Sequence, residues 1–449
     1  MANTFGVSGL RGEANLSLTP DLVFGFGRFL GHHIGRDCDH KVRAVIGRDT
    51  RKSSDMLEAA ISAGLMASGC DVYLMHVTTT PSVSYITRAA GFDCGVMITA
   101  SHNPYYDNGI KVISPDGEPM GDDIFSLFQG YAENGMQGIP YADRDHIGNC
   151  IDYERGREDY MKHLVSVPSV SLKGLRIGID CANGASSSIA HKVFDSLDCE
   201  VMFVNDAPDG VNINARCGSA HPEVVRTLVL ENHLDAGFSL DGDADRCIAV
   251  DADGNEVNGD HFNLIYATYL KKRGRLSNNL VVGTVVSNMG LRKALEKEGI
   301  DFITTGVGEP LVRKCMVERG SIIGGEQCGH MVFAEHSTTG DGIVTTLKML
   351  DVMAEEGRSL AELASPLTIY PQVQISLKVT DKKAASSDPA VVAVVNRITG
   401  ELGTSGRVLM RHSDTESLIR IMVESEDISL CRRYADEIAA AVKEQGYLA

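Results

Sequence analysis

The chain has 449 residues, of which 43% are hydrophobic and 23% charged, values typical of a globular protein with several hydrophobic cores. At roughly 150 residues per domain, this length suggests about three domains. Acidic residues outnumber basic ones by 60 to 42, and the net charge of −18 argues against binding to nucleic acid or to an anionic membrane.

The first 350 residues alternate short β-branched runs with amphipathic stretches, a pattern that predicts mainly parallel sheets covered by helices on both faces. A helix is predicted to begin at Thr19 and Pro20, a threonine N-cap followed by proline, with apolar residues recurring at helical spacing after it. Strands are predicted in this part at residues 44–47, 72–75, 95–99, 175–180, 236–240 and 280–286.

The pattern changes after residues 365–372, a segment with two prolines that is typical of a linker. Strands are predicted beyond it at residues 373–379, 407–411 and 418–423, and an amphipathic helix at 427–446. These elements indicate a small α+β domain. The predicted domains therefore cover residues 1–152, 153–254, 255–366 and 367–449.

No apolar run approaches the roughly 18 residues of a membrane-spanning helix, and the segment MANTFGVSGLRGEAN lacks the basic and apolar regions of a signal peptide. The 11 cysteines are odd in number, scattered between Cys38 and Cys431, and include no CxxC pair. This distribution is typical of reduced thiols rather than of a disulfide framework, so we expect a cytoplasmic protein.

Four polar segments follow predicted strands or lie in loops, where the ligand sites of open α/β sheets gather. The first is TASHNP at residues 99–104, in which Ser101 offers a nucleophile and His102 a nearby proton carrier. The GxSxG pattern of a hydrolase nucleophile is absent from this segment. An ordinary turn rich in serine, asparagine and proline is the alternative at this position.

The second segment, DGDADR at residues 241–246, has three carboxylates at alternate positions, which project to one side of an extended chain. Hard carboxylate oxygens suit Mg²⁺, and a cation would relieve the repulsion between Asp241, Asp243 and Asp245. An EF-hand does not fit, because Ala252 stands where its loop requires glutamate. A solvated acidic loop is the alternative.

The two remaining segments are weak evidence when each is taken alone. Residues 324–330, GGEQCGH, combine glycines that permit close approach of a ligand with Glu326 and His330, which form hydrogen bonds and move protons. Residues 411–416, RHSDTE, combine Arg411 with two hydroxyl groups, a composition suited to binding phosphate.

In this order and spacing, the four segments resemble the phosphoserine, metal, sugar and phosphate loops of the α-D-phosphohexomutase superfamily, and the resemblance extends over essentially the whole chain. Further segments resemble the phosphoglucosamine mutase branch of that superfamily. They lie at residues 5–12, 46–51, 208–214, 217–223 and 338–344.

The resemblance implies an α/β protein in which three similar mixed-sheet domains are followed by a smaller C-terminal α+β domain around a central cleft. It implies an enzyme that interconverts glucosamine 6-phosphate and glucosamine 1-phosphate through a phosphoserine and a 1,6-bisphosphate intermediate, supplying UDP-N-acetylglucosamine synthesis. A hexose 1,6-bisphosphate would be the activator. Phosphoglucomutase or phosphomannomutase activity is the alternative within the family, and because the branch includes dimers, a homodimer is also expected.

The resemblance also assigns roles to individual residues. Ser101 would carry the phosphoryl group. One Mg²⁺ per chain would be bound by Ser101, Asp241, Asp243 and Asp245. The remaining site residues would be Arg11, His102, Lys111 and Arg246 for catalysis, Glu326, Cys328 and His330 for the sugar, and Arg411, Ser413 and Thr415 for the phosphate that is not transferred.

Four positions depart from the family pattern and leave sugar specificity and phosphate affinity open. Cys328 replaces a serine of the sugar loop, Asp414 a glycine or asparagine of the phosphate loop, Ser417 a proline, and Gly306 a residue that is often lysine. Two other classes of protein stay open from the residues alone. They are a Mg²⁺-dependent phosphohydrolase and a sugar-phosphate sensor without catalytic activity.

Overall fold

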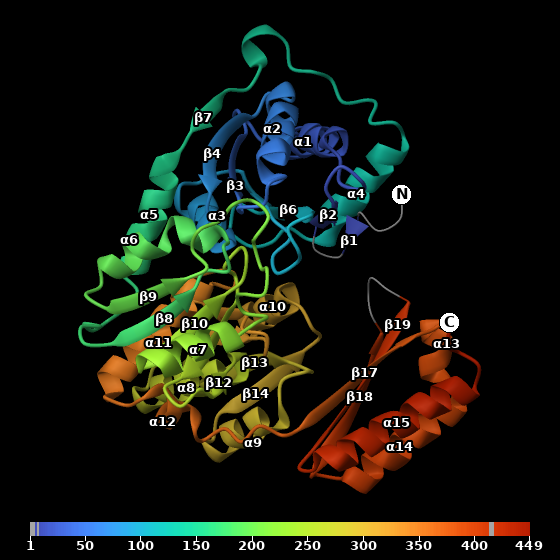
Figure 1. Cartoon of the computed structure of the whole chain (residues 1–449). Coiled ribbons are helices and arrows are strands. Elements are labelled where there is room, and N and C mark those ends of the chain that lie inside the picture. The colour runs from blue at the N-terminus through green and yellow to red at the C-terminus, as the bar shows by residue number, and fades with distance from the viewer. Residues whose placement is uncertain (1–4, 7–8, 413–416) are drawn as a thin grey trace. The chain divides into compact units, whose positions relative to one another are not determined.

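A computed structural model describes residues 5–6, 9–412 and 417–449 (Figure 1). The strands in this part of the chain form four sheets, of seven, five, four and three strands. The chain divides into two compact units, one formed by Met1–Ser287 with Leu295–Pro366 and the other by Asn288–Ala294 with Leu367–Ala449. Three α/β sheets and one small antiparallel sheet with helices confirm the predicted fold class.

The first sheet is mixed. Its strands, in spatial order, are β1 (Phe5–Gly6), β2 (Gly9–Glu13), β6 (Asp107–Ile113), β5 (Cys94–Ile98), β3 (Arg43–Arg48), β4 (Asp71–Val77) and β7 (Cys150–Asp152). The helices around it are α1 (Pro20–Gly35), α2 (Ser54–Ala67), α3 (Thr80–Ala89), α4 (Asp122–Glu133) and α5 (Glu154–Val165). The strands predicted at 44–47, 72–75 and 95–99 are confirmed as β3, β4 and β5.

Helix α1 begins as its sequence predicts. The hydroxyl of Thr19 accepts a hydrogen bond from the backbone of Leu22 at 3.3 Å, and Pro20 occupies the first helical position. Phe26 and Leu30, which lie on the apolar face, are fully buried in the core beneath the sheet. The cap therefore aligns this face with the sheet.

The second sheet has the strand order β12 (Glu256–Val257), β11 (Cys247–Asp251), β10 (Ala236–Leu240), β8 (Arg176–Asp180) and β9 (Glu200–Val204). The third sheet has the order β14 (Asp301–Thr305), β13 (Leu280–Thr284), β15 (Ile323–Gly325) and β16 (Met331–Phe333). The helices of this region are α6 (Ala190–Asp195), α7 (Glu223–Asn232), α8 (Gly259–Lys272), α9 (Met289–Lys297), α10 (Glu309–Arg319), α11 (Gly342–Glu356) and α12 (Leu360–Ala364).

The expectation of mainly parallel sheets is wrong for the first two sheets, in which half of the strand pairings are antiparallel. These pairings are β1–β2, β2–β6 and β5–β6 in the first sheet, and β10–β11 and β11–β12 in the second. Each of the first three sheets contains a hairpin that returns the chain antiparallel, namely β5–β6, β10–β11 and β15–β16. A returning strand has the same apolar content as a parallel one, so strand–helix alternation does not reveal it. The three hairpin connections carry the first three polar segments of the sequence.

The second unit contains the sheet β17 (Gln372–Lys378), β19 (Leu418–Ser425) and β18 (Gly406–His412), in that order and antiparallel throughout. Its helices are α13 (Lys382–Ser387), α14 (Pro389–Leu402) and α15 (Ile428–Glu444). Figure 1 shows α14 and α15 together on one side of the sheet. The predicted strands and the closing helix of this small domain are confirmed, with α15 beginning and ending within two residues of the predicted bounds.

Candidate active site

Three hairpin connections meet within the first unit. Ser101, after β5, donates a hydrogen bond from Oγ to Oδ2 of Asp241, after β10, at 2.7 Å. The backbone N–H of Cys247, which begins β11, donates to the carbonyl of Gly329 in the third connection at 3.1 Å. Segments that are more than 200 residues apart in the sequence therefore form one polar site.

Ser101 has a left-handed backbone conformation, with φ of 51°, and is only 3% exposed. A left-handed conformation is uncommon for a residue with a side chain and persists where neighbouring groups hold it. Two donors hold the carbonyl of Ser101, since Arg51 Nη2 and Asn214 Nδ2 each donate to it at 2.8 Å. The hydroxyl of Ser101 is thus held beside the loop of residues 241–246, the aspartate loop.

Gly242 allows the serine and aspartate loops to approach. A Cβ atom at this position would lie 2.7 Å from the carbonyl oxygen of Ser101, a backbone atom that is itself held by hydrogen bonds. Residue 242 therefore has to be glycine for Ser101 to keep its present position beside Asp241.

The carboxylates of Asp241, Asp243 and Asp245 are buried, and each offers an oxygen within 4.8 Å of the others. Burial and the neighbouring carboxylates of Asp245 and Asp243 hold the pKa of Asp241 well above its usual range. Lys111 Nζ donates to Asp243 Oδ2 at 2.7 Å and to Asp245 Oδ2 at 2.9 Å. One lysine thus balances part of a strong concentration of negative charge.

The chemistry of this set fits a magnesium ion. Oδ1 of Asp243 and Oδ1 of Asp245 are both buried and have no hydrogen-bond donor among the described residues. A buried carboxylate oxygen without a donor is costly unless a cation binds it, and an all-oxygen set of carboxylates and one hydroxyl is the type that Mg²⁺ selects. The buried aspartate triad therefore supports a magnesium site at this position.

Basic groups surround the same loops. Burial would lower the pKa of Lys111, but the carboxylates of Asp243 and Asp245 outweigh it and raise that pKa. Desolvation and the neighbouring Arg246 lower the pKa of Arg11, although Asp243 counteracts them. Lys111 and Arg11 thus remain cations that face an anion-binding site.

His102 is held as a neutral imidazole. Desolvation and the guanidinium groups of Arg246 and Arg11 lower the pKa of His102 to about 4. The Nη1 atom of Arg246 lies 3.0 Å from His102 Nδ1. Because arginine only donates, Nδ1 must be the acceptor and the ring proton must reside on Nε2.

The third connection brings Glu326 and His330 to this site. His330 Nδ1 lies 3.7 Å from Asp245 Oδ1, and its Nε2 lies 3.2 Å from Oε2 of Glu309. Burial would lower the pKa of His330, but Glu309 and Asp245 hold it well above the ordinary value. Glu326 accepts a hydrogen bond from the backbone of Gly308 at 3.1 Å.

The remaining residues predicted to bind the substrate are Cys328, Arg411, Ser413 and Thr415. Cys328 is exposed and forms no disulfide. Arg411 lies on β18 in the second unit, directly opposite Arg420 on β19. Ser413, Asp414 and Thr415 lie outside the described residues.

Several residues of the site were not among those predicted from the sequence. Thr80 donates to Asp243 Oδ2 at 2.6 Å, and Glu309 pairs with His330. Arg51 and Asn214 hold the carbonyl of Ser101. Arg51 and Asn214 lie in segments that carried the family resemblance. Thr80 and Glu309 each lie at the start of a helix, and nothing in their local sequence distinguishes them from ordinary residues there.

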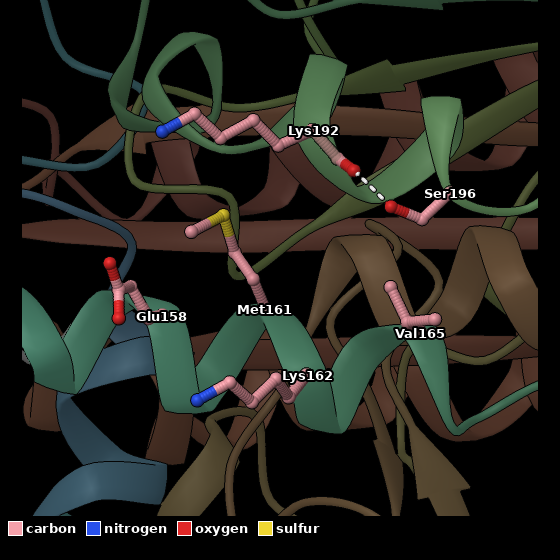
Figure 2. A pocket seen from close by; sticks show the side chains of 6 residues that line it. All are labelled: Glu158, Met161, Lys162, Val165, Lys192 and Ser196. Carbon is pink, nitrogen blue, oxygen red and sulfur yellow. Dashed lines mark hydrogen bonds between the residues drawn. The ribbon is translucent and has the colours of Figure 1, made fainter.

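A pocket of about 430 Å³ lies elsewhere in the first unit, between α5 and α6 (Figure 2). It is lined by Glu158, Met161, Lys162, Val165, Lys192 and Ser196. None of these residues belongs to the loops described above, so we assign the pocket no part in this site. Among the described helices, none has the length and apolar character to cross a membrane.

Comparison with protein families finds four successive matches along the chain. They are the models of phosphoglucomutase/phosphomannomutase alpha/beta/alpha domains I, II and III at residues 2–135, 158–254 and 258–370, and of the C-terminal domain at residues 375–441. The order of the models follows the order of the four sheets.

Two curated bacterial proteins are similar over their whole lengths. A phosphoglucosamine mutase of Lachnospira eligens is 50% identical over 448 residues, covering 100% of both chains. A phosphoglucosamine mutase of Lachnoclostridium phytofermentans is 46% identical over 448 residues with the same coverage.

Two solved structures have the same fold. A phosphoglucomutase/phosphomannomutase family protein of Burkholderia thailandensis matches with a TM-score of 0.83 and 22% identity, covering 100% of this chain and 99% of that one. The N-acetylphosphoglucosamine mutase of Aspergillus fumigatus, in complex with GlcNAc-6P and magnesium, matches with a TM-score of 0.69 and 17% identity, covering 99% and 96%. At these identities, the two structures show a shared fold and no more.

Proposed function

Since this chain belongs to the α-D-phosphohexomutase superfamily, we propose that it interconverts glucosamine 6-phosphate and glucosamine 1-phosphate. The observation that carries the proposal is the hydrogen bond of 2.7 Å between Ser101 Oγ and Asp241 Oδ2, which joins a strained serine to a buried carboxylate cluster. The curated relatives of equal length support the glucosamine substrate.

In this proposal Ser101 carries the phosphoryl group between turnovers. The sugar hydroxyl attacks the phosphorus, the bond to Ser101 Oγ breaks, and the product of this step is a glucosamine 1,6-bisphosphate. The bisphosphate then reorients in the site so that its other phosphate faces Ser101. Ser101 Oγ attacks that phosphorus, the bond to the sugar oxygen breaks, and glucosamine 1-phosphate leaves. No water enters either transfer, so atoms and charge balance between enzyme and sugar.

The residues that would hold one Mg²⁺ are Asp241, Asp243 and Asp245, together with the oxygen on Ser101. When bound there, the ion would draw negative charge from the transferring phosphoryl group. The Oδ1 atoms of Asp243 and Asp245, which accept no hydrogen bond from the described residues, support this ligand set. Thr80, which donates to Oδ2 of Asp243 at 2.6 Å, would keep the carboxylate oriented with Oδ1 free for the ion.

The cations around Ser101 would neutralise the phosphoryl group and move its proton. Lys111 and Arg11 stay protonated and would face the phosphoryl oxygens. Arg246 would bind the same group, in agreement with its place beside the ring of His102. His102, neutral with its proton on Nε2, would exchange a proton with the reacting sugar hydroxyl.

The sugar and the second phosphate would be held by the remaining predicted residues. Glu326 and His330 would form hydrogen bonds to the sugar, with Cys328 beside them as a weak donor. The phosphate that is not transferred would be bound in the second unit by Arg411, Ser413 and Thr415.

A hexose 1,6-bisphosphate would rephosphorylate an enzyme that has lost its phosphoryl group. The product would supply UDP-N-acetylglucosamine synthesis in the cytoplasm. The homodimer remains a prediction from the resemblance, and the three domain boundaries at 152, 254 and 366 remain predictions from the sequence.

Turnover of three substrates tests the proposal. Glucosamine 6-phosphate, glucose 1-phosphate and mannose 1-phosphate would be compared with Mg²⁺ and a hexose 1,6-bisphosphate present. We expect the glucosamine substrate to have the highest kcat/KM, and Ser101→Ala to abolish turnover. Ser62→Ala is the matched control, because Ser62 is buried in the same domain and its hydroxyl has no described partner.

Each other outcome points to a different activity. A preference for glucose or mannose phosphate would make the chain a phosphoglucomutase or phosphomannomutase. Release of inorganic phosphate without a sugar product would make it a phosphohydrolase. Full activity of Ser101→Ala would exclude a phosphoserine mechanism altogether.

A further inference from the structure

A second cluster of metal-binding side chains lies in the first domain, away from the site described above. Cys38 and His40 follow the end of α1, and Asp93 immediately precedes β5. Each offers one ligand atom, and the three atoms lie within 4.8 Å of one another. Cys38 and Asp93 are partly buried, while His40 is exposed and open to an entering ion.

The cluster is remote from Ser101. Strands β3 and β5 run parallel, with Ala44 opposite Cys94, so both begin at the same edge of the sheet. The cluster lies where these strands begin, whereas Ser101 follows the end of β5. Five residues of strand, at about 3.3 Å each, separate the two positions by roughly 16 Å.

The histidine is oriented as a metal-binding histidine usually is. Its Nε2 lies 2.8 Å from Asp93 Oδ1, and its Nδ1 lies 3.1 Å from Asp39 Oδ1. In metal sites the ring nitrogen that does not bind the ion commonly donates to a carboxylate, which fixes the tautomer and the ring plane. Asp39 is placed to do this while Nε2 faces the ion.

The second oxygen of Asp93 is already occupied. The backbone N–H of Arg43 donates to Asp93 Oδ2 at 2.7 Å, which fixes the carboxylate with Oδ1 toward His40. A neutral imidazole donates from only one nitrogen, so one ring nitrogen would otherwise direct its lone pair at a carboxylate. Either a proton or a metal ion between the groups removes that repulsion.

We propose that Cys38, His40 and Asp93 bind a zinc ion, with water as the fourth ligand. Tetrahedral zinc holds sulfur at about 2.3 Å and nitrogen or oxygen at about 2.0–2.2 Å, which separates the ligand atoms by about 3.5 Å. Small side-chain rotations would bring the three ligand atoms, which now lie within 4.8 Å of one another, to that spacing, with His40 Nε2 and Asp93 Oδ1 moving apart from their present 2.8 Å. Thiolate and imidazole favour zinc over magnesium, in contrast to the all-oxygen set of Asp241, Asp243 and Asp245.

The bound ion would join the end of α1 to the start of β5. Cys38 packs against the core cluster that contains Cys70 and Cys94, so its sulfur lies at the boundary between core and solvent. The zinc would have a structural role, and the proposal is independent of the phosphoryl-transfer function.

Metal binding to the full chain tests the proposal. The protein would be freed of metal, saturated with Mg²⁺ to fill the aspartate triad, and titrated with Zn²⁺ against a chromophoric chelator. Co²⁺ would serve as a second probe, because a bound thiolate produces a charge-transfer band. We expect one Zn²⁺ per chain and a thiolate band with Co²⁺.

The variants separate this site from any other thiol. Cys38→Ser should abolish the thiolate band and, like His40→Gln, weaken Zn²⁺ binding by at least about tenfold, because losing even a group that only supports a metal ligand costs about 10- to 100-fold in affinity. Cys150→Ser, which removes an exposed cysteine of the same domain, should change neither, and turnover should persist in all three variants. Zinc affinity and a thiolate band that are unchanged in Cys38→Ser, or no zinc bound beside Mg²⁺, would overturn the proposal.

Discussion

The absence of a side chain at Gly242 allows Ser101 to keep its position beside the aspartate loop. The carbonyl oxygen of Ser101 accepts hydrogen bonds from Arg51 and Asn214, which hold the backbone of Ser101 in place. In this position the oxygen leaves no space for a Cβ atom at residue 242. The left-handed backbone of Ser101 therefore depends on a residue that itself contributes no reacting group.

We predict that Gly242→Ala lowers kcat at least about tenfold, because a displacement of about 1 Å at a reacting group costs up to about a hundredfold in rate. Steady-state kinetics with glucosamine 6-phosphate would measure the change. Gly130→Ala is the control, since Gly130 is exposed on α4 and a Cβ there meets nothing within 4 Å. Unchanged kcat in Gly242→Ala would mean that the two loops adjust without cost.

At the scale of elements, helix α8 begins with a reciprocal cap that involves a buried histidine. The backbone N–H of Asn258 donates to His261 Nδ1 at 3.2 Å, and the side chain of Asn258 accepts from the start of the helix. Burial lowers the pKa of His261 to about 4. The cap therefore requires the neutral ring.

The sign of the pH dependence follows from that lowered pKa. Below the unfolded value of about 6.5, the unfolded chain binds a proton that folded His261 does not, so stability falls as the pH falls from 7 toward 4. At pH 5 the lowered pKa of His261 makes the free energy of unfolding about 2 kcal/mol smaller than it is at neutral pH. His261→Gln should remove that loss, because glutamine keeps the reciprocal cap without a titrating group.

Urea unfolding of the wild type and His261→Gln at pH 7.5 and pH 5 would measure the effect. The difference in stability between the two pH values should shrink in His261→Gln and stay unchanged in His32→Gln, which removes a partly exposed histidine of α1. An identical pH dependence in His261→Gln and wild type would show that other groups cause the acid sensitivity.

The elements also indicate how far sequence can predict structure. Apolar runs predicted β3, β5 and β10 to within one or two residues, because buried strands require them. The strands that return from the site loops, β6, β11 and β16, were not predicted, because strand–helix alternation does not reveal a strand that returns directly beside the one before it. Ser101 and Asp241 were predicted from their own loops, but Thr80 and Glu309 reach the site only through tertiary packing.

At the scale of the whole molecule, the net charge is −18, yet several basic side chains lie around one cluster of carboxylates. Lys111 pairs with two of the three aspartates and leaves two buried oxygens without donors. The folded chain thus contains a charge imbalance that a divalent cation would correct.

We predict that Mg²⁺ raises the thermal unfolding temperature. A ligand present at about 100 times its Kd stabilises the folded state by about 2.7 kcal/mol. Asp243→Asn should abolish most of this Mg²⁺-dependent rise, while Asp253→Asn, at an acidic turn after β11, should keep it. Differential scanning calorimetry with and without Mg²⁺ would measure both, and a rise that is equal in Asp243→Asn would place the ion elsewhere.

The proposed function requires Ser101 to accept a phosphoryl group and to pass it to a sugar phosphate. The most direct measurement is intact-mass spectrometry of the protein after incubation with Mg²⁺ and glucosamine 1,6-bisphosphate, followed by fragmentation and a chase with glucosamine 6-phosphate. We predict one phosphoryl group per chain, located on Ser101 and lost in the chase as bisphosphate forms. A chain that turns over the substrate while Ser101 stays unmodified, or a phosphoryl group on another residue, would contradict this prediction.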